Sequence, residues 1–520
     1  MELLKISEPG TNYLTTSLAN KDKKIAVGID LGTTYSLVAT INNGKLQTLS
    51  DEYNRSLLPS VVHYQENKKI IGWKALKYAS YDPINTIFSV KRLLGYSLSE
   101  IKKRYPDLPY QFKTSKNDFP LISTSYGITN PIQVSSEILF ELSERARHML
   151  KSNLSGAVIT VPAYFNDTQR GATREAANKC GLHVLRLLNE PTAAAIAYGL
   201  DSKQEGIIAV YDLGGGTFDI SLLRLKKGIF EVLSTGGIAT LGGDDFDRLL
   251  VNWMQCKIAI NTTDNVILQR KFLEAAGTAK INLSDHVKTI VKLDKWEVLV
   301  TRSEFEALIY RSVQRTISMC RRTIKDANLK VEEVLQVIMV GGSTRIPLIR
   351  KMVEKFFGVI PLTSIDPEKV VVLGAAIHAD FLVGNKTDQE VLLLDVIPLS
   401  LGIETLGGGV EKIIYRNTPI PTSKVKYFTN FQKGQTSIII HVLQGEREQV
   451  INCRSLARFT LSGLPSMEAG QACMKVIFQL DENGLLRVTA TEQITGTTAS
   501  IKLDPTYGLT DREMISMIQE

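Results

Sequence analysis

The spacing of hydrophobic residues changes near residue 384 and divides the chain into two parts. From Ile25 to about Val383, β-branched apolar runs alternate with segments in which apolar residues recur every three or four positions. Such alternation is typical of strands and helices arranged in layers. One helix is predicted over residues 135–151, and another is predicted to start at Pro191, because proline suits the first helical turn. The first part is therefore expected to be an α/β domain.

Beyond residue 384 the apolar runs become shorter and turns become frequent. Residues 437–443, 476–480 and 485–491 are rich in strand-forming residues, and Asn483-Gly484 lies between the last two. An Asn-Gly pair between two such runs is a strong hairpin signal. This part is expected to be a compact all-β sandwich of about a hundred residues.

These patterns predict five segments. They are an N-terminal tail (1–24), an α/β domain (25–384), a connecting segment (385–395), the β-sandwich (396–503) and the start of a truncated helical region (504–520). The connecting segment contains Leu392-Leu393-Leu394. Periodicity alone favours one buried strand for these leucines, because short apolar runs usually belong to a core.

Composition narrows the class of protein. The chain has 520 residues, 44% hydrophobic and 22% charged, which is the balance of an ordinary soluble protein with two or more domains. The net charge of +7 is dispersed, so no nucleic-acid surface is expected. The five cysteines form no Cys-x-x-Cys pair, and neither a signal peptide nor an apolar run of ~18 residues is present. We therefore expect a cytoplasmic protein without a cysteine metal site or a membrane partner.

Two loops of nearly the same sequence suggest the chemistry. Asp30-Leu31-Gly32-Thr33-Thr34 and Asp212-Leu213-Gly214-Gly215-Gly216-Thr217 each follow an apolar run. Glycine lets the backbone approach a ligand closely, and unpaired amide groups can surround a phosphate. One such loop is usually a simple turn, but two copies favour two similar lobes that hold one polyphosphate. A third loop, Val340-Gly341-Gly342-Ser343-Thr344-Arg345, is either a strand-to-helix turn or a backbone surface for a purine base.

Together with Val161-Pro162-Ala163-Tyr164-Phe165 and Asn189-Glu190-Pro191-Thr192-Ala193-Ala194-Ala195, these loops resemble the nucleotide-binding domain of heat-shock-protein-70 chaperones. The segments are long, collinear and specific, and the resemblance spans almost the whole chain from Ile25 onward. It implies a two-lobed, actin-like ATPase domain, a hydrophobic interdomain linker, an all-β sandwich that binds extended peptides, and a helical lid that starts near the C-terminus.

The resemblance also implies a site for ATP or ADP with Mg²⁺, and with K⁺ as a further candidate cation. Asp30 and Asp212 would hold the hydrated Mg²⁺, and Lys91 would lie near the terminal phosphate, although sequence alone assigns this lysine to the surface. Glu190 would lie near the attacking water, or would be a favourable charge at a helix start. The implied catalytic residues are Lys91, Glu190, Thr217 and Asp219; the phosphate-binding residues are Gly32, Thr33, Thr34, Gly214, Gly215 and Gly216; the adenosine-binding residues are Lys280, Ser284, Gly341, Gly342, Ser343 and Arg345.

Two positions depart from the family pattern. Gly277 stands where the family usually has a glutamate that binds the ribose, and Tyr35 replaces a common asparagine. The loss of the glutamate is expected to weaken nucleotide affinity or to speed nucleotide exchange.

Further residues are implied to couple the nucleotide site to the peptide site. Pro162 and Arg170 match relay residues of the family, and the linker docks on the ATPase domain when ATP is bound. The implied linker residues are Leu392, Leu393, Leu394 and Asp395, and the implied peptide-binding residues are Leu401, Ile403, Leu406, Phe428, Phe431, Ile438 and Ile440. The bulky Phe431 replaces a residue that is often small, which should narrow the groove and restrict the clients.

Residues 3–10, 444–448, 453–459 and 504–511 resemble the iron–sulfur-assembly branch of the family more than its general members. That resemblance implies a monomer whose client is the iron–sulfur scaffold protein, engaged through a Leu-Pro-Pro-Val-Lys-type segment and delivered by a J-domain co-chaperone. One alternative is a general heat-shock chaperone with broad hydrophobic-peptide clients. Another is a small-molecule kinase or a filament-forming protein on the same fold, against which the all-β part and the triple leucine argue.

Overall fold

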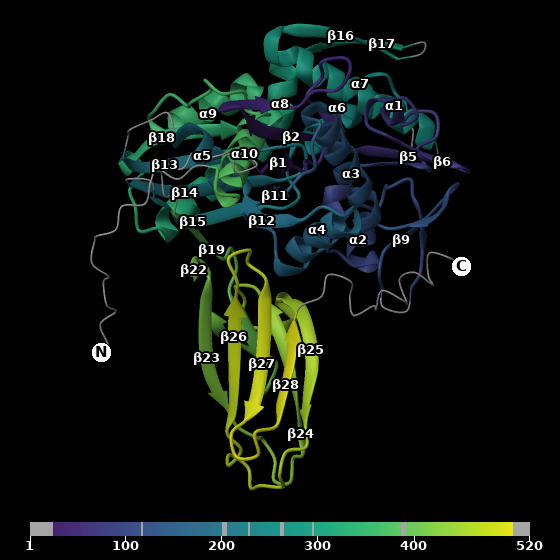
Figure 1. The fold of residues 1–520 in the computed structure, drawn as a ribbon. Helices are drawn as coiled ribbons and strands as arrows, with labels where there is room; N and C mark the ends of the chain where they lie inside the picture. Colours follow the sequence, from purple (N-terminus) through teal and green to yellow (C-terminus); the bar gives the residue numbers. More distant parts are fainter. Residues whose placement is uncertain are drawn as a thin grey trace, which may run out of the picture.

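The computed structural model describes residues 24–115, 118–199, 205–226, 229–260, 265–293, 296–385 and 392–502. An α/β part extends to residue 385, and an elongated all-β part begins beyond residue 396 (Figure 1). The predicted N-terminal tail up to residue 23, most of the connecting segment and the predicted C-terminal helical region lie outside the described residues.

Two mixed six-stranded sheets form the frame of the α/β part. The first has the order β12-β11-β1-β2-β3, with β4 paired to β2. Since β1, β11 and β12 run parallel, their carboxyl ends share one edge, where the loop after Asp30 and the helix that starts at Glu190 emerge. The strands are β1 (Ala26–Asp30), β2 (Tyr35–Asn42), β3 (Lys45–Thr48), β4 (Leu58–Pro59), β11 (Gly156–Val161) and β12 (Val184–Asn189).

The second sheet has the order β18-β13-β14-β15-β19-β22. The parallel pair of β13 and β18 places Asp212 beside Val340, so the second and third glycine loops leave the sheet at the same edge. Strand β19 belongs to the connecting segment and β22 to the all-β part, so this sheet crosses the boundary between the two parts. The strands are β13 (Gly206–Leu213), β14 (Phe218–Lys226), β15 (Ile229–Ile238), β18 (Val334–Val340), β19 (Leu392–Val396) and β22 (Pro419–Ile420).

Helices α5 (Glu190–Gly199) and α10 (Val370–Leu382) share one buried cluster with both sheets. The cluster contains Val158 from the first sheet and Val210 from the second. The two helices touch backbone to backbone, because a Cβ atom at Gly374 would lie 1.8 Å from the carbonyl oxygen of Ala193. Small residues therefore fix the separation between the two halves of the α/β part.

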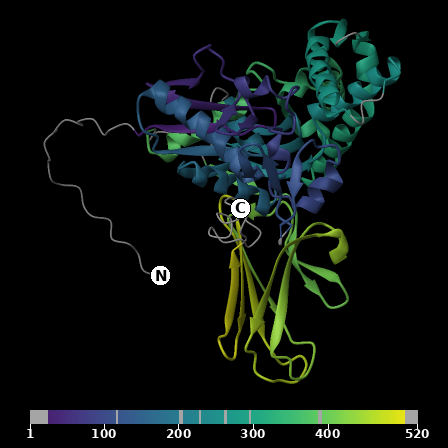
Figure 2. The ribbon, with the colours of Figure 1, turned by 90° about the vertical axis from the view of Figure 1, so that its right-hand side faces the viewer.

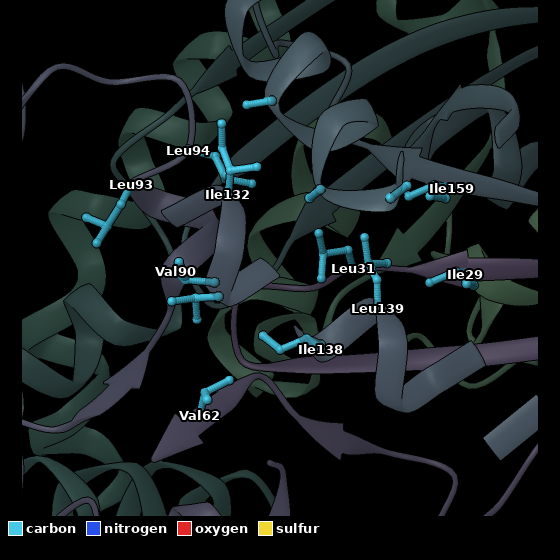
Figure 3. Packing of buried hydrophobic residues seen from close by; sticks show 14 of the residues in the cluster. Ile29, Leu31, Val62, Val90, Leu93, Leu94, Ile132, Ile138, Leu139 and Ile159 are labelled. Atoms are coloured by element: carbon cyan, nitrogen blue, oxygen red, sulfur yellow. The ribbon is translucent and has the colours of Figure 1, made fainter. Parts of the chain in front are cut away.

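The outer faces are covered by longer helices and small sheets (Figure 2). In the first half, Ile138 and Leu139 of α3 share a core with Leu31 and Ile159 (Figure 3). This half adds β5 (Val61–Gln65), β6 (Lys68–Ile71), α1 (Trp73–Leu76), β7 (Thr86–Phe88), the 3₁₀ turn η1 (Val90–Arg92), α2 (Leu98–Arg104), β8 (Gln111–Lys113), β9 (Leu121–Thr124), β10 (Gly127–Thr129), α3 (Pro131–Leu150) and α4 (Asp167–Lys179). The second half adds α6 (Gly243–Lys257), α7 (Val266–Asp285), β16 (Lys288–Leu293), β17 (Trp296–Thr301), α8 (Arg302–Asp326), the 3₁₀ turns η2 (Val331–Glu333) and η3 (Gly342–Arg345), and α9 (Pro347–Phe357).

The all-β part consists of two four-stranded sheets around one core that contains residues of both. One sheet has the order β21-β20-β24-β25 and the other β23-β26-β27-β28. Their strands are β20 (Leu401–Thr405), β21 (Gly409–Ile414), β23 (Thr422–Phe428), β24 (Ser437–Gln444), β25 (Arg454–Ser462), β26 (Met474–Leu480), β27 (Leu486–Glu492) and β28 (Thr498–Lys502), and the 3₁₀ turn η4 is Val450–Asn452.

The predicted local elements are confirmed with small shifts. Helix α3 starts at Pro131, four residues before the predicted start, because Asn130 accepts a hydrogen bond from the amide of Gln133 and caps the helix. Helix α5 starts at Glu190, directly before Pro191. Strands β26 and β27 form the antiparallel pair that Asn483-Gly484 predicted.

His378 is a buried polar residue at the centre of this fold. It lies on α10, is 2% exposed, and neither ring nitrogen has a hydrogen-bond partner among the described residues. Burial, together with the nearby positive charge of Arg186, lowers the pKa of His378 to about 3. The native state therefore holds this histidine in its neutral form.

We predict that His378 makes the α/β part less stable in mild acid. Below pH ~6.5 the unfolded chain binds a proton that the native state does not, so the free energy of unfolding falls by about 1.4 kcal/mol per pH unit, or roughly 2 kcal/mol by pH 5. In His378→Gln this fall in the free energy of unfolding should be absent. Urea unfolding followed by tryptophan fluorescence tests this, since all three tryptophans (Trp73, Trp253 and Trp296) lie in the α/β part. The exposed His286, as His286→Gln, is the control; identical pH dependence in His378→Gln and wild type would contradict the prediction.

Candidate functional site

A single cleft of about 1060 Å³ runs between the two halves of the α/β part. All three glycine loops contribute to its walls. Of the implied catalytic, metal and phosphate residues, it is lined by Asp30, Gly32, Thr33, Thr34, Lys91, Glu190, Asp212, Gly214, Gly215 and Thr217. Asp219 and Pro162 instead line a small adjoining cavity of about 20 Å³, which shares Thr33, Lys91 and Thr217 with the cleft.

The first glycine loop is held by hydroxyl groups. The amide of Gly32 donates to Oγ of Ser36 at 3.2 Å, and Oγ of Ser60 donates to the carbonyl oxygen of Gly32 at 2.8 Å. A Cβ atom at Gly32 would lie 2.0 Å from the carbonyl oxygen of Tyr35, so the tight turn requires glycine. Oγ1 of Thr160 donates to Asp30 and orients its carboxylate.

The second glycine loop rests on the start of α6. The amides of Gly243 and Asp244 donate to the carbonyl oxygens of Gly214 and Gly215, both at 2.9 Å. The loop also meets the first one, because a Cβ atom at Gly215 would lie 2.2 Å from Oγ1 of Thr34. The two loops thus form one surface rich in backbone amides and hydroxyls, which suits a chain of phosphates.

Four carboxylates and one lysine lie at this surface; Glu190, Asp212 and Asp219 are buried, and Asp30 is partly buried. Nζ of Lys91 donates to Oε1 of Glu190 at 2.6 Å, and both side chains are less than a tenth exposed. Burial and the charge of Glu190 raise the pKa of Asp30 to about 6, that of Asp219 to about 7, and that of Asp212 well above its usual range. Burial alone would lower the pKa of Lys91, but Glu190 and Asp30 raise it. One lysine does not compensate this acidic cluster, so the site suits a cation.

The third glycine loop closes the far end of the cleft. Gly341 has a φ of 84°, and a Cβ atom there would lie 2.4 Å from the carbonyl oxygen of Leu213. The implied adenosine residues all line the cleft: Lys280, Ser284, Gly341, Gly342, Ser343 and Arg345. The guanidinium of Arg345 pairs with Asp366 and Glu368.

Gly277 also lines this end of the cleft, as does Tyr35. A Cβ atom at Gly277 would make ordinary contacts, the nearest 3.6 Å from the carboxylate of Asp247. Nζ of Lys280 donates to Asp247 at 2.8 Å. Burial raises the pKa of Asp247 to about 6, although Lys280 lowers it. Asp247 therefore supplies a carboxylate on the wall where Gly277 has none.

The all-β part contacts the α/β part through Arg170 on α4 and the turn between β26 and β27. The guanidinium of Arg170 donates to Asn189 at 2.6 Å and to the carbonyl oxygen of Asn483 at 3.4 Å. The side chain of Asn483 accepts from the amide of Leu187, and Asp167 accepts from the amide of Leu486. The hairpin turn is thus a contact surface between the two parts.

The connecting segment contacts the same region. Phe230 and Glu231 of β15 stand opposite Leu393 and Leu394 in a parallel pair, and Leu393 is buried. Oγ1 of Thr192, on α5, donates to Asp395 at 2.7 Å. The strand predicted from periodicity is therefore present, and the interdomain segment implied by the resemblance is that same strand. For Leu392 only the backbone is described.

The implied peptide-groove residues fall into two groups. Leu406 and Phe431 are exposed. The others belong to the core of the all-β part or pack against it: Leu401, Ile403, Phe428, Ile438 and Ile440.

Comparison with known proteins identifies the family. The family model "Hsp70 protein" matches residues 26–520. The chain belongs to the Hsp70 family. Similar proteins named "Chaperone protein HscA" come from Yersinia enterocolitica (59% identity), Serratia proteamaculans (58%) and Escherichia coli (57%). Each alignment covers all of this chain and 84% of the relative. In the described part of this Hsp70 chain, no helix is long and apolar enough to cross a membrane.

Sequence reasoning missed several residues of this Hsp70 site. Arg92 pairs across the cleft with Asp244 and Asp245, and its position next to Lys91 was the sole signal for it. The sequence predicts a turn role for Asn483, whereas its side chain also binds the α/β part. Such partners are distant in sequence, so spacing does not reveal them.

We predict that Asn483→Ala loosens the contact between the two parts of this Hsp70 chain. The amide of Leu187 would lose its acceptor, and since one hydrogen bond contributes about 1 kcal/mol, its hydrogen exchange should accelerate about five-fold. Hydrogen exchange resolved to β12 measures this. Asn452→Ala, at an exposed asparagine, is the matched control. Unchanged protection at Leu187 would show that the contact does not persist in solution.

Proposed function

We propose that the chain is an ATP-dependent molecular chaperone. Residues 25–384 would form the two-lobed, actin-like ATPase domain, residues 385–395 the linker and residues 396–503 the peptide-binding β-sandwich, with a helical lid starting in 504–520. The observation that carries the proposal is one cleft in which two amide-rich loops meet the Lys91–Glu190 pair, Asp30 and Asp212, with Asp219 in the adjoining cavity.

In this proposal the amides and hydroxyls of the first two loops bind the phosphates of ATP or ADP. Lys91 stabilises charge on the terminal phosphate, while Glu190, Asp219 and Thr217 orient the attacking water, because positioning and charge stabilisation dominate phosphoryl transfer. Asp30 and Asp212 hold hydrated Mg²⁺, with K⁺ as a further candidate. The cation supplies neutralisation of phosphate charge, and the raised pKa values of the carboxylates fit its presence.

The adenosine end of ATP would lie against the third loop. Backbone at Gly341 and Gly342 leaves room for the base, and Arg345 and Ser284 flank it. Lys280 would donate to the ribose. With Gly277 in place of an acidic residue, we expect weaker retention of nucleotide than in family members that have a glutamate there.

Coupling to the peptide site would pass through β19. Its pairing with β15, the Thr192–Asp395 bond and the Arg170–Asn483 bond connect the linker and the all-β part to helices and strands that reach the cleft. Hydrolysis can change peptide affinity only if these contacts differ in free energy between the ATP and ADP states. Pro162, which lines the cavity beside Lys91, is the expected relay on the nucleotide side.

The client would be the iron–sulfur scaffold protein, in cluster assembly and transfer in the cytoplasm, with a J-domain co-chaperone. The HscA relatives and the sequence segments that resemble the iron–sulfur branch support this choice. The exposed ring of Phe431 would narrow the groove formed with Leu401, Ile403, Leu406, Phe428, Ile438 and Ile440. A general heat-shock chaperone with broad clients is the alternative.

Steady-state ATP hydrolysis with peptides tests the proposed function. We expect a Leu-Pro-Pro-Val-Lys-type peptide to stimulate hydrolysis several-fold more than an unrelated hydrophobic peptide. Equal stimulation by both would favour the general chaperone. If neither peptide binds, as judged by fluorescence anisotropy, the assignment of the all-β part as a peptide site is wrong.

Lys91→Met should lower the single-turnover rate of ATP hydrolysis about 100-fold or more, because positioned charge contributes that much to a transition state. Nucleotide binding should persist, since the loop amides remain. Lys69→Met is a matched control, because Lys69 also pairs with a carboxylate, Glu137, at 2.7 Å but lies outside the cleft. Wild-type hydrolysis in Lys91→Met would remove Lys91 from the reaction.

A further inference from the structure

Arg92 follows Lys91 in the chain but reaches a different partner. Its Nη2 donates to the carbonyl oxygen of Gly215 at 3.0 Å and to Asp245 at 2.9 Å, and its Nε lies 3.4 Å from Asp244. The side chain is 4% exposed. Arg92 belongs to the first half of the α/β part, whereas all three partners belong to the second, so this arginine links the two sides of the cleft.

The backbone around Arg92 is fixed by packing. Val90, Leu93 and Leu94 lie in the same buried cluster as Leu31, which precedes Gly32 in the first glycine loop (Figure 3). The 3₁₀ turn η1 is therefore held against the core that carries the first loop. The packing limits the positions that the side chain of Arg92 can take. Arg92 therefore holds its partners, Gly215 and Asp245, in a fixed position relative to the first half.

Glycine in the second loop makes room for the guanidinium. A Cβ atom at Gly216 would lie 2.7 Å from Nε of Arg92, and Gly216 is the one implied phosphate residue that does not line the cleft. The second loop therefore places Gly216 directly against Arg92, and a side chain at position 216 would collide with the guanidinium group.

The partners of Arg92 also support the second loop. The carboxylate of Asp245 accepts from the amide of Gly242 and closes the start of α6, and the amide of Asp244 donates to the same Gly215 carbonyl that Arg92 binds. The carbonyl oxygen of Gly215 thus accepts one hydrogen bond from each half, from Arg92 in the first and from the amide of Asp244 in the second. This contact fixes the orientation of the peptide group between Gly215 and Gly216.

The charges at this contact are mutually dependent. Burial opposes the charge of Arg92, but Asp244 and Asp245 raise its pKa, so the guanidinium stays protonated. Oγ of Ser89 adds a second link across the cleft, donating to Asp244 at 3.1 Å. Without Arg92, two carboxylates beside the phosphate surface would lack their buried counter-charge and would repel a polyphosphate.

We propose that Arg92 is a positioning residue that clamps the second phosphate loop to the first half of the α/β part and thereby retains and aligns the nucleotide. The inference rests on the proposed ATPase function. Arg92 acts through Gly215 and the start of α6, which distinguishes it from Lys91, the residue proposed to lie at the terminal phosphate.

The test uses the whole chain with Arg92→Met and Arg92→Lys. Loss of buried, charge-assisted hydrogen bonds should speed release of a fluorescent ADP about ten-fold or more in Arg92→Met. It should also raise the KM for ATP more than it lowers kcat. Arg92→Lys keeps the positive charge but lacks the planar guanidinium group, so its rate of ADP release should lie between those of wild type and Arg92→Met. If Arg92→Met does not fold, Arg92→Lys carries the test, with at least a three-fold faster release expected.

Arg224→Met is the matched control, because Arg224 pairs with a carboxylate of its own half, Glu231, at 2.8 Å and lines neither the cleft nor the adjoining cavity. Its ADP release should equal that of wild type. Asp245→Asn should also speed release, and the double variant with Arg92→Met should be no faster than the faster single variant, because the two residues act as one contact. A purely structural role would lower the melting temperature without this non-additivity.

The clamp is overturned if ADP release from the folded Arg92 variants matches wild type, or if Arg224→Met has the same effect as Arg92→Met. A wild-type chain that binds neither ATP nor ADP would instead overturn the proposed function, and the clamp with it. Nucleotide binding and hydrolysis by wild type, with unchanged release in the variants, would leave the proposed function in place and remove the clamp alone.

Discussion

The fold of the α/β part brings more negative charge into one buried place than the protein neutralises there. Lys91 pairs with Glu190, while Asp30, Asp212 and Asp219 remain close enough for burial and their neighbours to raise their pKa values. Asp30 ends β1 and Glu190 opens α5, while Asp212 near the end of β13 stands opposite Asp219 near the start of β14. The sheets can keep this arrangement only with an added positive charge or a bound proton, so the site favours a ligand that brings cations with it.

This electrostatic arrangement depends on a close mechanical fit. Helices α5 and α10 touch at Gly374, so the two sheets have little freedom to move apart at that point. The cleft lies beyond this contact and is crossed by Arg92 and Ser89. A close backbone contact on one side and polar links on the other therefore restrain the relative position of the two halves.

The features that the sequence predicts correctly are those that depend on residues close together in the chain. The glycine loops, the Asn483-Gly484 hairpin and the helix start near Pro191 each depend on residues a few positions apart, so their signals are contiguous. The bond from Arg92 to Asp245 joins residues 153 positions apart, and that from Leu187 to Asn483 spans 296. No periodicity encodes such pairs. General burial statistics assign Lys91 to the surface, and only the family resemblance assigns it to the site.

The strand order of the second sheet has a consequence for synthesis of the chain. Residues 392–394 pair with residues 229–231 at the start of β15, which would otherwise be the outer strand of that sheet. An uncovered strand edge can pair with another chain and promote aggregation. While the chain leaves the ribosome, the α/β part would present this edge until β19 has been made. Once it has been made, the segment between the two parts would therefore also shield the start of this strand edge from pairing with another chain.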